Sequence, residues 1–158
     1  MAKKKKKVYP VITNKKVRRD YLIGEEYEAG IVLQGSEVKS IRNAEMSIQE
    51  AYVRVIKNEV WLIGAHIATY EKSYALNHDP YRKRKLLLRK SEIRKLALKT
   101  REVGVTIMPL TAYFNPCGLV KLKIVVCKGK KKYDKRGALQ KDAIKKEIQT
   151  HIKENKYE

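Results

Sequence analysis

The charge of this chain is concentrated at its two ends, which leaves only the central part able to build a core. Residues 1–20 hold nine Lys or Arg and one Asp, and residues 128–158 hold eleven basic and five acidic side chains. The 107 residues between them carry seventeen basic and eleven acidic side chains. A segment of this length buries about two thirds of its unfolded surface and suits one domain. We therefore expect a compact module with two cationic arms.

The net charge of +20 indicates a polyanionic partner. A membrane surface is also polyanionic, but the apolar runs here are only a few residues long, whereas a bilayer span needs roughly 20. Residues 3–7 are all Lys, and no apolar segment follows them, so the N-terminus does not resemble a signal peptide. We expect no membrane partner.

The chain has two cysteines, Cys117 and Cys127, and three scattered histidines, His66, His78 and His151. Their spacing does not fit a zinc site, and a disulfide framework needs more cysteine than this. We therefore expect a reducing, cytoplasmic location, two structural thiols, no metal and no cofactor.

The central part is rich in strand patterns. Alternating apolar residues predict three strands, over residues 27–34, 105–110 and 119–127, and one hairpin over residues 51–67. The hairpin is expected to turn at Lys57-Asn58, and its second arm is apolar on both faces, as in a central strand. In the last strand, Lys121 and Lys123 face away from the apolar side.

Three short helices are predicted among these strands: a helix capped by Ser36 that runs through Ile41, a basic helix over residues 79–88, and a helix over residues 91–102. The pair Asp79-Pro80 is a typical helix start, with Pro at the first helical position. No regular alternation of strand and helix occurs. The fold class expected is therefore mainly β, a small antiparallel barrel with added short helices.

Basic side chains on this barrel form the first candidate site. Lys121 and Lys123 would share a surface with the predicted basic helix, which carries Arg82, Lys83, Arg84 and Lys85. Together they would follow a phosphate backbone. The alternative is that such lysines only form a solvated face.

Glu28 is a carboxylate on the outward face of the strand over residues 27–34. It either pairs with a neighbouring Lys or Arg or accepts hydrogen bonds from the bases of irregular RNA.

The organisation predicted is a flexible basic arm over residues 1–13, a barrel over 14–130 and a basic tail over 131–158. The tail is either a solubilising segment or an RNA-binding one; Tyr133 and Arg136 offer stacking surfaces that favour the second interpretation. The apolar stripe of Ile144, Ile148 and Ile152 is too thin to hold a helix alone. We expect the tail to be disordered and to become helical only against a partner.

An enzyme is disfavoured by the sequence. It shows no paired carboxylates, nucleophile elbow or Gly-rich phosphate loop. His78 and Asp79 fit a turn and a helix cap, and His66 fits a core histidine. We therefore expect no small-molecule substrate. The residues alone point to a basic, barrel-like RNA-binding protein with mobile arms.

Four segments, in order, resemble the bacterial SsrA-binding protein (SmpB) family: residues 14–21, 27–40, 77–88 and 128–136. The resemblance extends over about residues 14–150. It implies an oligonucleotide-binding (OB) barrel that binds the tRNA-like part of transfer-messenger RNA (tmRNA, or SsrA RNA). With elongation factor Tu, that complex would reach ribosomes stalled on truncated messages.

The resemblance also implies roles for particular residues. Glu28, Leu87 and Lys121 fall at the family's RNA-contact positions. The wider set of candidate RNA contacts comprises Lys123, Asn14, Lys15, Arg18, Arg19, Arg82, Arg84 and Lys85. The tail positions expected to act in the decoding region of the small subunit and in the empty message channel are Gly129, Lys130, Lys131, Asp134, Lys135 and Arg136.

One position departs from the family pattern. Many members have His where this chain has Arg19, and a guanidinium retains stacking but does not titrate near neutral pH. The runner-up function is a generic single-strand RNA chaperone with an OB barrel. It would require aromatic platforms on the barrel face, whereas the outward positions Glu28, Lys121 and Lys123 offer charge.

Overall fold

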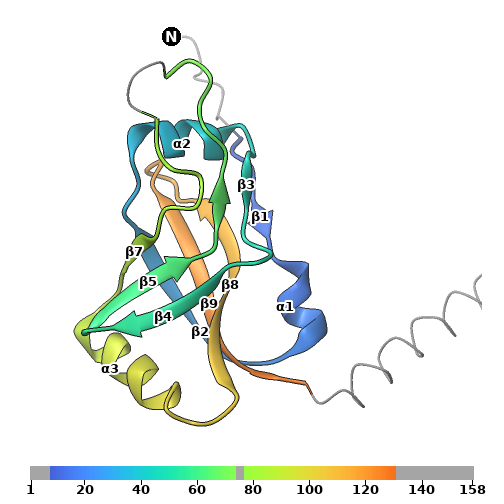
Figure 1. Cartoon of the computed structure of the whole chain (residues 1–158), viewed down its shortest axis with the longest axis vertical. Coiled ribbons are helices and arrows are strands. Elements are labelled where there is room, and N and C mark those ends of the chain that lie inside the picture. Colours follow the sequence, from blue (N-terminus) through green and yellow to red (C-terminus); the bar gives the residue numbers. More distant parts are fainter. Residues whose placement is uncertain (1–7, 74–76, 131–158) are drawn as a thin grey trace, which may run out of the picture.

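The computed structural model describes residues 8–73 and 77–130 (Figure 1). The expectations for the tail, including Lys131, Asp134, Lys135 and Arg136, lie outside these residues. So do those for most of the N-terminal arm.

Strands dominate the described part. They are β1 (Ile12–Thr13), β2 (Tyr21–Ile31), β3 (Met46–Ser47), β4 (Tyr52–Ile56), β5 (Glu59–Ile63), β6 (His66–Ile67), β7 (Arg84–Leu87), β8 (Val105–Phe114) and β9 (Val120–Gly129). The helices are α1 (Lys15–Asp20), α2 (Gly35–Arg42) and α3 (Lys90–Lys99). Helices α2 and α3 lie at opposite ends of the strand assembly (Figure 1).

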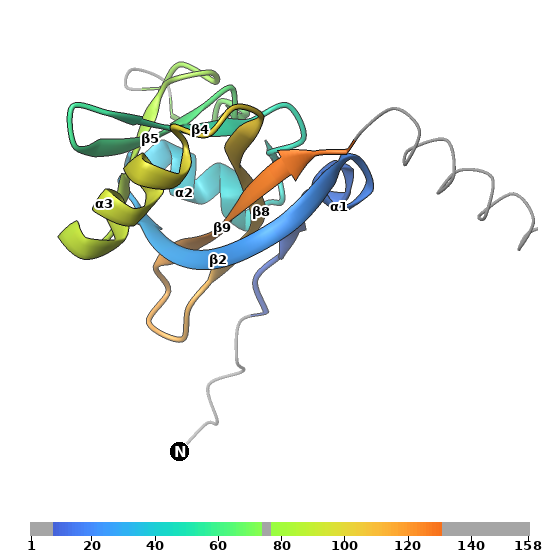
Figure 2. The same cartoon turned by 90° about the horizontal axis from the view of Figure 1, so that it is seen from below.

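Six antiparallel strands close into a barrel. Their hydrogen-bonded order is β8-β4-β5-β7-β2-β9, and β9 pairs back with β8. The long strand β2 curves around the barrel beside β9 (Figure 2). Strand β1 extends the edge of β8, while β3 and β6 form a separate pair. The expected mainly β, antiparallel barrel with short helices is confirmed, and its closure leaves few exposed strand edges.

The last strand carries the predicted core face. Val120, Leu122, Ile124 and Val126 are buried in the main cluster inside the barrel. Val125 and Cys127 are buried as well, in a second cluster with Val17 of α1. Helix α1 therefore covers the outer face at this end of β9, and the pattern of β9 alone did not predict that cover. Burial raises the pKa of the Cys127 thiol to about 11.

The predicted basic helix over residues 79–88 is wrong. Residues 84–87 form β7, which lies between β5 and β2. The Asp79 carboxylate accepts a hydrogen bond from the Tyr81 backbone N–H at 2.9 Å, so Asp79-Pro80 begins a turn. Pairing with two neighbouring strands overrides the local helix-start signal, because sheet contacts depend on residues far away in the chain.

Other boundaries also differ from the prediction. Strand β2 begins at Tyr21 and ends at Ile31, earlier than the predicted 27–34. Helix α2 is capped by Gln34, whose backbone N–H donates to Glu37 at 2.8 Å, so Ser36 lies within the first turn instead of at the cap. The last predicted helix exists as α3 over a shorter range.

The hairpin is confirmed for β4 and β5. Lys57 and Asn58 form its turn with positive φ values of 49° and 61°, as two-residue hairpin loops require.

Candidate nucleic-acid interface

Glu28, Leu87 and Lys121 come together although they lie on three different strands. Gly30 of β2 stands opposite Leu87 of β7 on one side and opposite Lys121 of β9 on the other. Glu28 is two residues earlier on β2, so it points to the same side of the sheet. All four residues line one open depression, with Leu88, Arg89 and Glu92 at its border. We call it the β2–β7–β9 face.

Gly30 makes room for the apolar centre of this face. A Cβ atom at Gly30 would approach the Leu87 Cβ to 3.3 Å, so a larger residue would displace that side chain. The Leu87 side chain is 54% exposed although it is apolar. An exposed apolar side chain in a depression that also holds a carboxylate and an ammonium group suits packing against the face of a base or a sugar.

The Glu28 carboxylate interacts with the phenol of Tyr113 on β8. Burial and this carboxylate raise the pKa of Tyr113 to about 12. Lys123 stands directly opposite Glu28, and its Nζ lies 5.8 Å from the centroid of the Tyr113 ring. A carboxylate has about four acceptor positions, so one phenol leaves Glu28 able to accept base N–H groups.

Tyr113 is a member of this face that the sequence pattern did not predict. The predicted strand ended at Leu110, whereas β8 continues to Phe114 and places Tyr113 opposite Lys121. Extending the strand pattern past residue 110 would have identified it.

Lys121 and Lys123 lie on the outer side of β9, where they were expected. Lys121 is half-buried and Lys123 is exposed. Lys85 also points outward, but from β7 instead of from a helix, and its Nζ lies 3.1 Å from the carboxylate of Glu59. Arg82 is half-buried and contacts the carboxylate of Glu37 at 2.8 Å.

Arg84 does not belong to any exposed surface, so its predicted place on a basic helix face is wrong. Its side chain is completely buried, and Nε donates to the Glu37 carboxylate at 2.9 Å. The guanidinium also donates to the carbonyl oxygens of Ala65 and Pro80 at 3.0 and 3.1 Å. Alternation along β7 turns Arg84 inward, and this makes it a structural residue.

Asn14 is also buried, against the expectation of an RNA contact. Its side-chain amide donates to the backbone carbonyls of Ile48 at 2.9 Å and Pro109 at 3.3 Å. In this conformation it ties the start of α1 to the barrel and presents no polar atom to solvent.

The remaining candidates form a second cluster at the end of β9. Lys15, Arg18 and Arg19 are exposed on α1. The Lys130 backbone N–H donates to the Asp20 carbonyl at 3.0 Å, and Gly129 stands opposite Tyr21. The first basic motif and the root of the tail therefore lie side by side. Tyr21 and Glu28 are seven positions apart along β2, so this cluster is roughly 20 Å from the β2–β7–β9 face.

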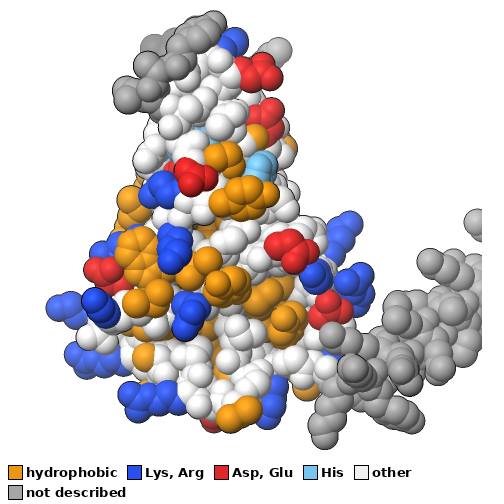
Figure 3. All heavy atoms as spheres, viewed as in Figure 1, with side chains coloured by type: hydrophobic (Ala, Val, Ile, Leu, Met, Phe, Trp, Pro, Cys, Tyr) orange, Lys and Arg blue, Asp and Glu red, His pale blue; other side chains and the backbone are white. Residues whose placement is uncertain are grey.

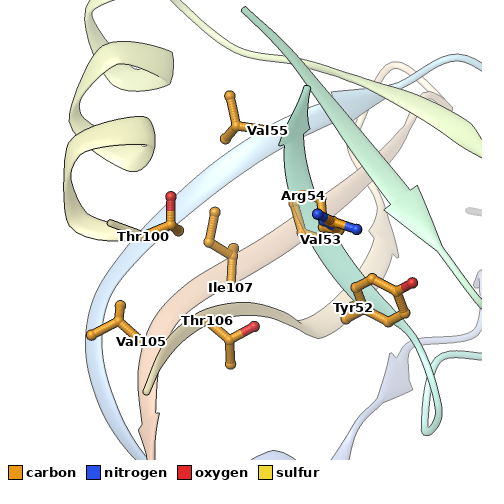
Figure 4. Close-up of a pocket in the computed structure, with 8 residues that line it drawn as sticks. All are labelled: Tyr52, Val53, Arg54, Val55, Thr100, Val105, Thr106 and Ile107. Carbon is orange, nitrogen blue, oxygen red and sulfur yellow. The ribbon is translucent and has the colours of Figure 1, made fainter. Parts of the chain in front are cut away.

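Another cavity lies apart from both clusters. Strands β4 and β8 pair only at Val53 and Ile107 within the described residues, and a cleft opens beside that point toward Val55, Thr100 and Val105 (Figure 4). It contains none of the predicted site residues.

Neither a metal site nor a membrane span occurs within residues 8–73 and 77–130. No group of three or more His, Cys, Asp and Glu side chains is placed to hold a metal ion there. No helix in those ranges has both the length and the apolar character to span a bilayer.

A closed antiparallel barrel with a cationic outer face defines the class of OB-type nucleic-acid-binding barrels. The family model described as SmpB protein matches residues 11–154, so the chain belongs to the SmpB family.

Relatives and a solved structure agree with this assignment. The SsrA-binding protein of Symbiobacterium thermophilum is 45% identical over 94% of this chain and 94% of its own length. That of Listeria welshimeri is 48% identical over 91% of this chain and 93% of its own. A chain in a solved structure of tmRNA–SmpB in the center of the bacterial ribosome is 45% identical and superposes with a TM-score of 0.67, covering 78% of this chain and 86% of that one.

Proposed function

We propose that this protein binds the tRNA-like domain of tmRNA through the β2–β7–β9 face and acts with that RNA in trans-translation on stalled ribosomes. The observation that carries the proposal is the convergence of Glu28, Leu87 and Lys121 from three strands on one depression. Membership of the SmpB family and the similarity to a tmRNA-bound relative support the choice of RNA.

The chemistry of the face suits a folded RNA. Lys121 and Lys123 contact phosphates, which dominate affinity in such complexes. Leu87 packs against a base or sugar, and Glu28 accepts hydrogen bonds from a base edge that is not engaged in regular pairing. A carboxylate inside a cationic surface repels phosphates, so it is useful only where it meets a base.

The second cluster supports a separate role for the tail. Gly129 and Lys130 leave the barrel beside α1, far from the β2–β7–β9 face. In the proposed function, residues 131–158 enter the decoding region and the empty message channel and become helical there. Lys131, Asp134, Lys135 and Arg136 act at the start of that segment, and elongation factor Tu takes part in delivery. The protein would then act in the cytoplasm.

A gel-shift experiment tests the RNA target. The full chain should bind a transcript of the tRNA-like domain much more tightly than an unrelated stem-loop of equal length. Leu87→Asp should abolish the preference without changing the thermal unfolding midpoint, because the side chain is 54% exposed. Leu98→Asp on α3 is the matched control, since Leu98 is 60% exposed and lies outside the face. Equal affinity for both RNAs would instead favour a generic RNA chaperone.

The tail is tested by Pro substitution. Ile144→Pro should leave binding to the tRNA-like domain intact but stop addition of the RNA-encoded tag in a reconstituted stalled-ribosome system, because an interior Pro costs a helix about 3 kcal/mol. Ile144→Ala keeps the helix and serves as the control. Normal tagging by the Pro variant would show that the tail acts as extended charge.

A further inference from the structure

The outer face of β4, β5 and β7 presents rings and cations together. Tyr52 and Arg54 lie on β4, Trp61 and Ile63 on β5, and Lys85 on β7. We call these five residues the β4–β5–β7 face. Hydrophobic side chains gather over this part of the molecule, with Lys and Arg side chains among and around them (Figure 3).

Strand alternation fixes the direction of these side chains. Val60 and Leu62 are fully buried in the barrel core, so Trp61 and Ile63 on the same strand point outward. Val53 is buried in the same way, and its neighbours Tyr52 and Arg54 on β4 are exposed. Tyr52 is 39% exposed.

The cross-strand register places Trp61 between two cations. Arg54 stands directly opposite Trp61 on β4, and Lys85 stands opposite it on β7. Neighbouring strands are about 4.8 Å apart, so this row of three residues spans about 10 Å. The acidic residue in the adjoining row is Glu59, which is paired with Lys85 at 3.1 Å.

This face is continuous with the β2–β7–β9 face. Lys85 and Leu87 are alternate residues of β7 and point to the same outer side, about 7 Å apart along the strand. An RNA that covers Leu87 thus reaches Lys85 and then Trp61 without a gap. This continuity favours RNA over a protein as the occupant.

We propose that Trp61 is a stacking platform for an unpaired base of the bound RNA, with Arg54 and Lys85 contacting the flanking phosphates. A ring set between cations is the arrangement by which proteins hold single-stranded nucleotides, since every base has a π face and every nucleotide a phosphate. The inference rests on the proposed function, because the RNA that supplies the base is the one bound at Leu87.

The experiment uses the intrinsic fluorescence of the unaltered full chain, because Trp61 is its single tryptophan. A transcript of the tRNA-like domain is titrated while binding is followed independently by gel shift. Stacking should quench the indole emission, with the same midpoint as the gel shift. Binding without any change in emission would overturn the stacking proposal and leave the proposed function intact. Absence of binding would overturn both.

Three variants separate stacking from general packing. Trp61→Leu should weaken RNA binding by about 5- to 100-fold, whereas Trp61→Phe, which keeps a ring, should retain most of the affinity. Leu98→Ala is the control for loss of an exposed apolar side chain, and circular dichroism melts check that each variant folds. Unchanged affinity of Trp61→Leu would overturn the proposal. So would emission that responds to elongation factor Tu but not to the RNA, because that result would make the face a protein-docking surface.

Discussion

The carboxylate of Glu28 on β2 interacts with the phenol of Tyr113 on β8 and helps to raise the pKa of that phenol. The two strands are not neighbours, because β9 lies between them. The interaction therefore reaches across the outer side of β9, where Lys123 stands opposite Glu28 and its Nζ lies 5.8 Å from the centroid of the Tyr113 ring.

The interaction with Glu28 should have a measurable effect on the titration of Tyr113. Burial, followed by the Glu28 carboxylate, raises the pKa of Tyr113 from 10.0 to about 12. Since the folded pKa is raised, the stabilisation is complete below pH 10 and is lost as the pH rises through 12. Glu28→Gln should lower the pKa of Tyr113 but keep it above 10, because burial remains. NMR of labelled tyrosines, assigned with Tyr113→Phe, measures this pKa. A value that stays near 12 in Glu28→Gln would contradict the interaction between the two residues.

Glu28→Gln should also weaken binding to the tRNA-like domain by about tenfold, near 1.4 kcal/mol, as expected for loss of one charge-assisted hydrogen bond. The direction of this change in affinity is informative, because removing a negative charge should strengthen RNA binding if only bulk electrostatics acted. Glu26→Gln removes the same charge from an exposed position on the same strand and should bind equally well or more tightly. Gel shifts of both variants at one salt concentration test this prediction. Tighter RNA binding by Glu28→Gln than by the unaltered chain would refute base recognition.

Lys121→Ala should weaken RNA binding and reduce its dependence on salt. If Lys121 contacts one phosphate, the slope of log affinity against log salt should fall by about 0.7–0.9. The barrel should remain folded, because the side chain lies on the outer side of β9. Lys72→Ala, in an exposed loop, is the control for loss of one charge. If Lys121→Ala binds RNA with the same affinity and the same salt slope as the unaltered chain, Lys121 is not part of the interface.

Glu37 should be essential for the stability of the fold and should not contact RNA. It is fully buried and holds both Arg82 and Arg84. Burial acts to raise its pKa, but hydrogen bonds from Arg82, the Gln34 backbone and Arg84 outweigh this and hold the pKa below 4.5. Glu37→Ala leaves the buried Arg84 guanidinium without its carboxylate partner and should lower the free energy of unfolding by about 3–5 kcal/mol.

The lowered pKa of Glu37 also gives a pH dependence. Its contribution to stability is present above pH 4.5 and is lost as the pH falls through the lower folded value. Urea melts between pH 7 and pH 3 give the free energy of unfolding of the unaltered chain and of Glu37→Gln. The two free energies should approach each other as the pH falls. Parallel curves over that range would show that Glu37 is not charged in the folded protein.

Much of the barrel was predictable from local sequence. The alternation of Val120 to Val126, the turn at Lys57-Asn58 and the outward direction of Lys121 were predicted correctly. Each depends on residues only a few positions apart, because strand alternation and tight turns are set by local backbone geometry. The segments that resemble the SmpB family likewise required only residue identities, and the family assignment was confirmed.

The tertiary structure alone decided which polar residues face the interior and which residues meet across strands. Arg84 is buried because Glu37, 47 positions earlier, neutralises it, and the segment around it is a strand because β5 and β2 pair with it. Glu28 finds Tyr113, and Trp61 finds its place between Arg54 and Lys85, only once the barrel has closed. Burial and pairing of this kind arise from long-range contacts, and the local pattern of a segment does not contain them.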